Sequence, residues 1–418
     1  MLGRQSIRYD TNVAVLTFKG PSAPMSIKLS ARVQAVKPSP TLAITARAAA
    51  LRAAGKDVIG LGAGEPDFDT PDHIKQAAIE AINKGQTKYT AVDGTASLKQ
   101  AIINKFKRDN DFDYAADQIL VSCGGKQSFY NLAQAVLDPG DEVVIPAPYW
   151  VSYPDMVLLA GAQPVLVHAD AKQNFKMTAA QLKGALTEQT RLVVINSPSN
   201  PTGMAYTREE LEALGEVLRE HPRVLIATDD MYEHILWEKG TFVNILNACP
   251  DLYGRTMVLN GVSKAYSMTG WRIGYAAGPA DVIKAMKKIQ SQSTSNPTSI
   301  SQAAAEAALN GDQGCIDVMM EQFKKRHDYV VERLNKMPGV ECLATDGTFY
   351  VFPSVKGLID AIDGVNDDLE LAEYLIENAG VALVPGTAFG LGGHARISIA
   401  TSMENLSAAL DRIEAAIS

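Results

Sequence analysis

Apolar and polar positions alternate along the chain with two different periods. Apolar residues recur every three or four positions, as in amphipathic helices, over stretches such as Thr70–Asn83, Ser97–Lys107 and Thr207–Arg219. Short apolar runs of the kind found in buried strands separate these stretches, for example Glu142–Pro146, Arg191–Ile195 and Val224–Thr228. Strands that alternate with helices form βαβ units, so the pattern predicts an α/β fold with a mostly parallel sheet.

The pattern changes near residue 310. A long charged helical stretch, Ile316–Lys336, is followed by three strand-like runs, which are Gly347–Phe352, Val381–Val384 and Ala395–Ala400. A last helix is expected to begin at Thr401, with the Thr401-x-x-Glu404 pattern as its capping box. We therefore predict a large domain over residues 66–310 and a smaller α+β domain over residues 311–418.

The first 65 residues are too few to form a domain of their own. Residues 25–65, which include the amphipathic stretch Leu29–Val36, are expected to pack with the small domain. Residues 1–24 carry three basic residues around the short apolar patch Val13–Leu16, a pattern that slightly resembles a targeting peptide. We interpret them as an N-terminal extension that is disordered or results from a start codon placed too early.

Composition and charge exclude several classes of partner. The 418 residues are 46% apolar and 21% charged, as in ordinary globular proteins, and the net charge of -8 would repel nucleic acids and anionic membranes. No apolar run approaches the roughly 18 to 20 residues of a membrane-spanning helix. The four cysteines form no CxxC pair and the six histidines no metal-binding pair, so we expect a cytoplasmic protein without a structural metal.

Two loops follow predicted strands and are rich in proline, Ala147–Trp150 and Asn196–Gly203. Open α/β sheets bind ligands at the carboxyl ends of their strands, so both loops are candidate walls of a site. A third candidate is Gly124-Gly125-Lys126, which precedes the helical run Gln127–Leu137. A glycine-rich turn at a helix start presents free N–H groups to a phosphate, although a simple helix start is a common alternative.

The densest candidate for chemistry is the run Gly261–Gly274, which follows the apolar strand Thr256–Leu259 and reads Gly-Val-Ser-Lys-Ala-Tyr-Ser-Met-Thr-Gly-Trp-Arg-Ile-Gly. Lys264 lies here among small residues. A lysine amine attacks an aldehyde only when burial or a nearby cation disfavours its protonated form. Arg272 and the apolar surroundings could supply both conditions, whereas an isolated Ser-Lys pair would more often be a surface turn.

This run resembles the pyridoxal-phosphate attachment signature of class I and II aminotransferases. The similarity extends from about Val36-Lys37-Pro38-Ser39 to the C-terminus through Gly62-Ala63-Gly64-Glu65-Pro66-Asp67-Phe68, Lys88-Tyr89-Thr90, Asn200-Pro201-Thr202-Gly203 and Asp229-Asp230-Met231-Tyr232. Within the family the chain is most similar to bacterial aspartate aminotransferases, a subgroup that includes bifunctional aspartate/prephenate enzymes. The resemblance implies fold type I, with a mostly parallel seven-stranded sheet in the large domain, and pyridoxal 5'-phosphate held by Lys264.

The resemblance also implies how the cofactor phosphate is held. Its cradle would comprise the Gly124-Gly125-Lys126 turn, Ser263 and Arg272, completed by Tyr89 from a second subunit. A shared site of this kind implies at least a homodimer.

The cofactor ring would be held by other residues. The Asp-x-x-Tyr spacing of the family selects Asp229 over its neighbour Asp230 as the partner of the pyridine nitrogen. Tyr232 and Asn200 would bond the ring oxygen. Trp150 would stack on the ring, although an ordinary core aromatic is the alternative.

Anionic substrates require cations, and the resemblance implies two. Arg396 would grip the α-carboxylate together with the backbone N–H of Gly64, although an arginine on a solvated strand face is an alternative. Lys126 would bind the distal carboxylate, near Trp150 and Asn200. Other aspartate aminotransferases use an arginine from the partner subunit, but the corresponding stretch 295–298 has none.

The resulting expectation is ping-pong transfer of the amino group of L-aspartate to 2-oxoglutarate. Prephenate as a second amino acceptor remains open. A carbon–sulfur lyase or decarboxylase on the same scaffold would share Lys264 and Asp229 but would not need the distal cation. A transcription regulator is disfavoured, because about 35 residues before the family match are too few for a DNA-binding domain.

Overall fold

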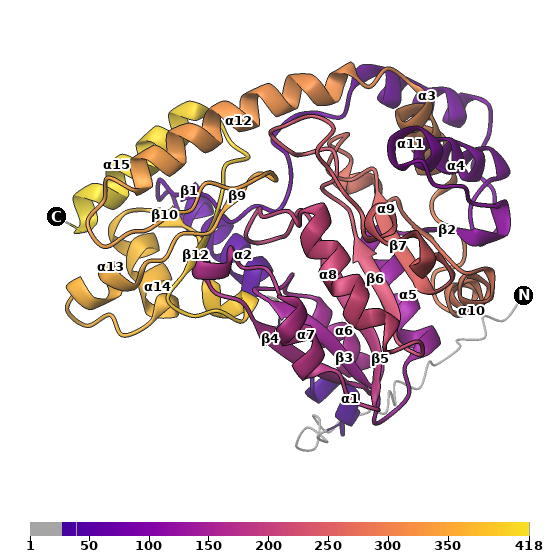
Figure 1. The fold of residues 1–418 in the computed structure, drawn as a ribbon. Helices are drawn as coiled ribbons and strands as arrows, with labels where there is room; N and C mark the ends of the chain where they lie inside the picture. The colour runs from indigo at the N-terminus through magenta and orange to yellow at the C-terminus, as the bar shows by residue number, and fades with distance from the viewer. Residues whose placement is uncertain (1–26, 39, 418) are drawn as a thin grey trace, which may run out of the picture.

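A mostly parallel sheet forms the centre of the larger part of the protein (Figure 1). The structure is a computed structural model that describes residues 27–38 and 40–417, so the extension expected over residues 1–24 lies outside the described residues. The strands of this sheet are β2 (Ile119–Ser122), β3 (Glu142–Ala147), β4 (Gln163–His168), β5 (Thr190–Asn196), β6 (Leu225–Asp229), β7 (Thr256–Gly261) and β8 (Gly274–Ala277). Their order is β2-β8-β7-β6-β5-β3-β4, and only β8 runs antiparallel to its neighbours. The predicted fold class is confirmed.

Helices cover both faces of this sheet, which explains why its strands read as continuous apolar runs. The helices are α3 (Asp72–Asn83), α4 (Ala96–Asn110), α5 (Gly125–Val136), α6 (Tyr153–Leu159), α7 (Ala179–Ala185), α8 (Arg208–Arg219), α9 (Ile245–Ala248), α10 (Ala280–Ser291) and α11 (Ser299–Asn310). Along β5, Leu192 and Val194 belong to the buried cluster that includes α5, α6 and α10. Val193 and Ile195 point the other way, into the cluster with α4, α7, α8 and α11.

A smaller unit packs beside the sheet. Its helices are α12 (Gly314–Leu334), α13 (Lys356–Ala361), α14 (Asp368–Asn378) and α15 (Met403–Ile417), and its strands are β9 (Tyr350–Val351), β11 (Val384–Pro385) and β12 (Ala395–Ser398). These strands form an antiparallel sheet in the order β11-β12-β9. A separate apolar cluster built largely from residues after 319 lies at its centre.

The segment before residue 65 contacts this smaller unit. It contains α1 (Ala31–Gln34), α2 (Pro40–Ala53) and β1 (Ile59–Gly60), and β1 pairs in parallel with β10 (Val381–Ala382). Ala48 and Val58 are buried with Ile376 and Ala382 in a small cluster of their own. Short 3₁₀ turns complete the chain at Ala116–Gln118, Ala171–Gln173, Pro250–Arg255, Thr269–Trp271 and Gly386–Phe389.

Several predicted boundaries differ from the structure. The last helix is capped by Ser402, whose Oγ accepts from the N–H of Asn405 at 3.1 Å, so the capping box at Thr401 is wrong. Thr401 instead accepts a hydrogen bond from the side chain of Asn405. The run Val381–Val384 is divided between β10 and β11, because its two ends pair with different strands. The expected strand Gly347–Phe352 shortens to β9, because Thr348 adopts a left-handed backbone conformation with φ of 65°.

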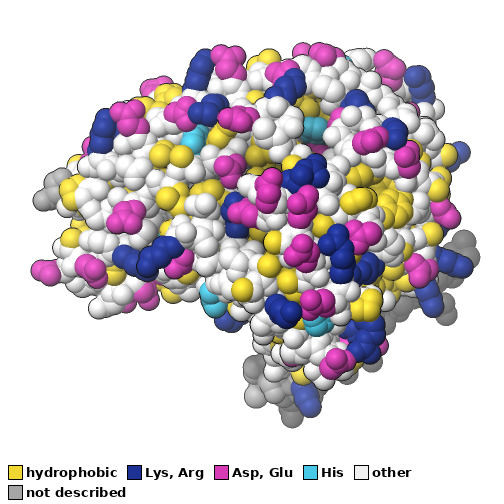
Figure 2. Space-filling model, in the orientation of Figure 1, with side chains coloured by type: hydrophobic (Ala, Val, Ile, Leu, Met, Phe, Trp, Pro, Cys, Tyr) yellow, Lys and Arg dark blue, Asp and Glu magenta, His cyan; other side chains and the backbone are white. Residues whose placement is uncertain are grey.

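The surface carries both signs of charge. Figure 2 shows one face of the molecule, on which basic and acidic side chains are interspersed among scattered apolar atoms. Among the helices in the described part of the chain, none has the length and apolar character needed to cross a bilayer.

Candidate active site

A cavity of about 440 Å³ lies where the carboxyl ends of the parallel strands meet the smaller unit. The ends of β5 and β6 contribute Asn196 and Asp229, whereas β9 and β12 contribute Tyr350 and Arg396. Both proline-rich loops predicted as walls line the cavity. The predicted site residues that line it are Gly64, Gly125, Lys126, Trp150, Asn200, Asp229, Tyr232, Ser263, Lys264, Arg272 and Arg396.

The amine of Lys264 lies in this cavity and donates a hydrogen bond to the carbonyl oxygen of Gly64 at 2.5 Å. Burial lowers the pKa of Lys264 to about 8, an effect to which the positive charges of Arg396 and Arg272 add and which Glu65 and Asp229 oppose. A fraction of the lysine is therefore neutral near neutral pH, as a nucleophile toward an aldehyde must be.

Asp229 and Asp230 follow each other in sequence but lie in different surroundings. Asp229 lines the cavity, and its carboxylate accepts hydrogen bonds from the hydroxyl of Tyr153 at 2.5 Å and from the N–H of Met231 at 3.3 Å. Asp230 is buried outside the cavity lining, where it accepts from Thr228 and Asn244. Burial raises the pKa of Asp229, and the bond from Tyr153 and the charge of Lys264 act against this rise.

The first turn of α5 packs closely against Arg272. Gly124 precedes the helix with φ of 89°, and a Cβ atom at this position would overlap the Arg272 guanidinium. Arg272 also has positive φ and donates to the carbonyl oxygen of Thr269 at 2.7 Å. The free N–H groups at the start of α5, the hydroxyl of Ser263 and this guanidinium therefore form a concave end of the cavity that suits a phosphate.

The cavity also contains a buried cation on β12. Arg396 is only 2% exposed, and it donates to Asn200 Oδ1 at 3.0 Å and to the carbonyl oxygen of Gly62 at 2.8 Å. Its Nε has no hydrogen-bond partner, and no carboxylate in the described part of the chain forms an ion pair with it. The interpretation of Arg396 as a residue on a solvated strand face is therefore wrong. A buried guanidinium without a counter-ion is suited to bind an incoming carboxylate.

The comparison with protein families settles the family. Residues 56–413 match the family model described as aminotransferase class I and II. The chain belongs to this family. The predicted family and the prediction that the protein is an aminotransferase are confirmed.

Relatives of this aminotransferase cover nearly all of the chain. A Nitrosomonas europaea protein named aspartate/prephenate aminotransferase is 60% identical over 397 residues, 94% of this chain and 100% of the relative. The structure of aspartate aminotransferase from Rhizobium meliloti is 50% identical, covers 94% of this chain and 99% of its own, and has a TM-score of 0.91. A Thermus thermophilus aspartate aminotransferase solved with maleate is 42% identical, covers 93% and 100%, and has a TM-score of 0.88.

Lys126 also lines the aminotransferase cavity. Its amine lies 5.2 Å from the centre of the Trp150 ring. Burial lowers its pKa, and the charge of Arg272 adds to this effect. The side chain is nevertheless exposed, so a solvated lysine at a helix start stays an alternative to a substrate-binding role. Trp150 lines the cavity and is half-buried, with its ring perpendicular to that of Tyr153, so it is not an ordinary core aromatic.

Tyr89 does not reach the cavity of its own chain. The side chain is 90% exposed, on the loop before α4. The buried side chain of Gln302 holds this loop by donating to Thr90 Oγ1 at 3.0 Å and accepting from the N–H of Thr95 at 2.8 Å. The loop is thus well fixed although the tyrosine itself is free, and its role in a second subunit stays a prediction.

Sequence reasoning missed several cavity residues, of which three make informative contacts. The hydroxyl of Tyr350 lies 3.0 Å from that of Tyr232, and its ring lies 4.4 Å from the guanidinium of Arg396. Tyr153, the first residue of α6, bonds Asp229, and it could have been found as the next aromatic residue after Trp150. Thr41 reaches the cavity from α2, and its buried hydroxyl has no hydrogen-bond partner. No local pattern marks Tyr350 or Thr41, because each lies far in sequence from the residues it joins.

Proposed function

We propose that the protein transfers the amino group of L-aspartate to 2-oxoglutarate with pyridoxal 5'-phosphate as its cofactor. One observation carries the proposal: the lysine with a pKa of about 8 lies in one cavity with a buried carboxylate and two separate cations. The lysine is Lys264 and the carboxylate is Asp229. The cations are Arg396 and Lys126, one for each carboxylate of a dicarboxylic substrate.

The side chains in the cavity fit the proposed cofactor. Ser263, Arg272 and the turn formed by Gly124, Gly125 and Lys126 would hold its phosphate, with Tyr89 added from a second subunit. Asp229 would keep the pyridine nitrogen protonated. Tyr232 and Asn200 would bond the ring oxygen, and Trp150 would lie on the ring face.

Lys264 would carry out the proton transfer. When bound, the cofactor supplies an aldehyde that links to amines and a ring that withdraws electrons from the substrate Cα. Lys264, once free, would take the proton from Cα and return it as an acid, and a pKa near the working pH suits both directions. Arg396 and the N–H of Gly64 would hold the α-carboxylate so that the Cα hydrogen points at the lysine amine.

A dicarboxylic substrate is supported by the second cation. Lys126 lies in the same cavity as Arg396, and the hydroxyls of Thr41 and Thr45 also line it. The related Thermus thermophilus enzyme is described with maleate, itself a dicarboxylate. A lyase or decarboxylase would have no need of this second cation.

Prephenate is a second candidate acceptor. The Nitrosomonas europaea and Cereibacter sphaeroides relatives, 60% and 55% identical, are both named aspartate/prephenate aminotransferase. Prephenate also carries two carboxylates, so the same pair of cations would receive it.

The oligomeric state, the location in the cell and the domain boundaries are proposed as well. We infer a homodimer with shared sites from the exposure of Tyr89, and a cytoplasmic location from the four free thiols. We place the cofactor-binding domain at residues 66–310 and the small domain at 311–418, with residues 25–65 packed on the latter.

A panel of amino donors and oxo-acid acceptors, prephenate included, tests the proposal on wild type, Lys264→Ala and Lys126→Ala. Aspartate with 2-oxoglutarate should be a preferred pair, Lys264→Ala should abolish turnover, and Lys126→Ala should selectively impair dicarboxylic substrates. Release of pyruvate and ammonia from the donor would identify a lyase instead. Substantial turnover by Lys264→Ala would overturn the assignment of the lysine.

A further inference from the structure

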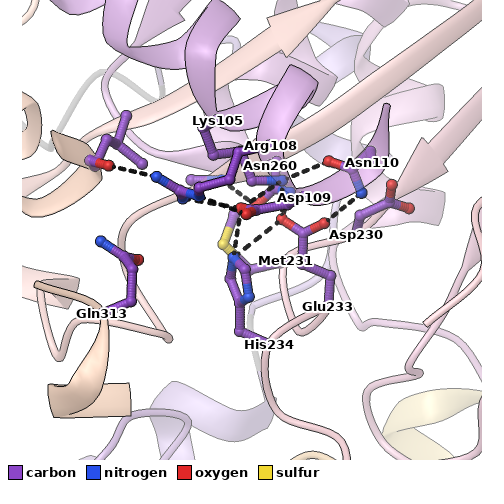
Figure 3. Close-up of polar contacts among 12 residues, drawn as sticks. Lys105, Arg108, Asp109, Asn110, Asp230, Met231, Glu233, His234, Asn260 and Gln313 are labelled. Atoms are coloured by element: carbon purple, nitrogen blue, oxygen red, sulfur yellow. Dashed lines mark hydrogen bonds and ion pairs between the residues drawn. The ribbon is translucent and has the colours of Figure 1, made fainter. Parts of the chain in front are cut away.

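A network of buried polar side chains surrounds Glu233, the residue after Tyr232 in the chain (Figure 3). Its centre is Glu233, whose carboxylate is 3% exposed. Oε1 forms an ion pair with Lys105 and accepts from Asn260 Nδ2 at 2.7 Å, and Oε2 accepts from Asn110 Nδ2 at 2.9 Å. The carboxylate therefore has donors on both oxygens and is almost entirely shielded from solvent.

The donors come from two elements that are distant in sequence from Glu233. Lys105 and Asn110 lie on the last turns of α4, and the Lys105 amine also donates to Asn110 Oδ1 at 2.8 Å. Asn260 lies near the end of β7, four residues before Lys264, and its Oδ1 accepts from the N–H of Gly261 at 2.7 Å. One carboxylate thus ties together α4, the 229–234 turn and the strand that leads to Ser263 and Lys264.

The charges of this cluster are already paired. Lys105, which is 1% exposed, lies 3.8 Å from Asp109, and Arg108 donates to both carboxylate oxygens of Asp109 at 2.6 and 3.0 Å. His234 lies 3.4 Å from Asp109 and 3.5 Å from Glu233, so these three residues could in principle surround a cation. The ammonium of Lys105 contacts the carboxylates of both Asp109 and Glu233 and supplies the positive charge that a metal ion would bring. We therefore assign the cluster to charge pairing rather than to a metal.

None of these side chains lines the cavity, although the segments they hold do. A buried ion pair is costly to form and is a poor source of net stability, whereas it fixes the relative position of the elements that it joins. We propose that Glu233, held by Lys105, is a positioning residue that fixes the 229–234 turn relative to the Ser263–Lys264 segment and thereby sets cofactor affinity. This inference rests on the proposed cofactor site.

The same carboxylate acts on the neighbouring Asp230. Burial raises the pKa of Asp230 to about 8, and the negative charge of Glu233 adds to the rise. The charge of Glu233 therefore favours the protonated form of Asp230. The network thus affects both the position of the turn and the pKa of Asp230.

A comparison of one single variant with one double variant tests the proposal on the full chain. Lys105→Met leaves the Glu233 carboxylate buried without its cation, whereas Lys105→Met/Glu233→Gln removes both charges. In the double variant the Asn110 side chain, released from Lys105, is free to turn its oxygen toward the introduced amide. Lys176→Met is the matched control, because Lys176 is 11% exposed and forms a 2.7 Å pair with Glu210 away from the cavity.

Three quantities are measured for each protein: the Kd for pyridoxal phosphate from tryptophan quenching of the apoenzyme, the absorbance of the lysine-bound cofactor, and the melting temperature. Lys105→Met should weaken cofactor binding about tenfold and shift the absorbance band, the double variant should recover most of the affinity, and Lys176→Met should leave both unchanged. If Lys105→Met does not fold, Asn260→Ala, which removes a single donor to Glu233, should weaken binding in the same direction.

The outcomes separate this inference from the proposed function. If wild type forms no absorbance band that Lys264→Ala abolishes, the proposed cofactor site fails. If wild type forms that band and Lys105→Met or Asn260→Ala lowers only the melting temperature, with unchanged Kd and absorbance, Glu233 is merely structural and the inference is overturned.

Discussion

The hydroxyl of Tyr153 offers a sharp test of how the cavity controls Asp229. It donates to Asp229 Oδ2 at 2.5 Å, and both groups are enclosed by the protein. Tyr153→Phe removes this one donor and keeps the ring that packs between Phe129 and Trp150. A hydrogen bond to a charged group contributes about 1.5–3 kcal/mol. If Asp229 acts in its charged form, kcat/KM for aspartate should fall about 10- to 150-fold, at 1.4 kcal/mol per tenfold.

The pH dependence of kcat/KM gives a second test of this prediction. The bond from Tyr153 lowers the pKa of Asp229, so its loss should raise that pKa and the carboxylate should be protonated at a higher pH. The acid limb of kcat/KM should therefore move to higher pH in Tyr153→Phe. Tyr114→Phe is the control, because Tyr114 is a buried tyrosine whose hydroxyl has no hydrogen-bond partner. Activity of Tyr153→Phe within twofold of wild type, with an unmoved acid limb, would refute the reasoning.

Three further predictions follow from the same cavity. Arg396→Leu should lower kcat/KM for aspartate at least about 30-fold, since a buried charge partner of the substrate is lost. The absorbance band of the bound cofactor should be retained. Loss of that band would place Arg396 in cofactor binding instead. In the apoenzyme, modification of Lys264 by an amine reagent should rise with pH, with a midpoint near pH 8, and Arg272→Met should move the midpoint upward. Mass spectrometry of the Lys264 peptide measures the extent of modification. A midpoint above pH 10 would contradict the lowered pKa. Tyr89→Phe should weaken cofactor binding although Tyr89 lies outside its own cavity, and a fully active monomer in light scattering would exclude this shared site.

Residues within contiguous motifs could be predicted from the sequence. Ser263, Lys264 and Arg272 lie in one run after a buried strand, so their proximity follows from local structure alone. The helices and strands that were predicted in the large domain agree with the structure to within a few residues, because their apolar periods are strong. Arg396 was harder, since a strand of four residues gives little alternation from which to infer its burial.

Contacts that join distant segments could not be predicted. Tyr350 meets Tyr232 across 118 positions, and Glu233 meets Asn110 across 123, so no spacing rule applies to either pair. The cap of the last helix could not be predicted either, although its two candidate residues are adjacent in sequence. Thr401 and Ser402 are adjacent and chemically similar, and only the backbone conformation decides that Ser402 bonds the N–H of Asn405.

The adjacent pair Asp229 and Asp230 shows what the structure adds to a motif. Side chains at consecutive positions of a strand point to opposite faces, so at the end of β6 only one of the two carboxyls can face the cavity. The hydroxyl of Tyr153 and the amine of Lys264 meet Asp229, whereas Asp230 lies near Glu233, whose negative charge favours its protonated form. The pKa values of two identical side chains are therefore perturbed by different residues, which approach them from distant parts of the chain. Glu233→Gln removes that negative charge, so the pKa of Asp230 should fall even though both aspartates are retained.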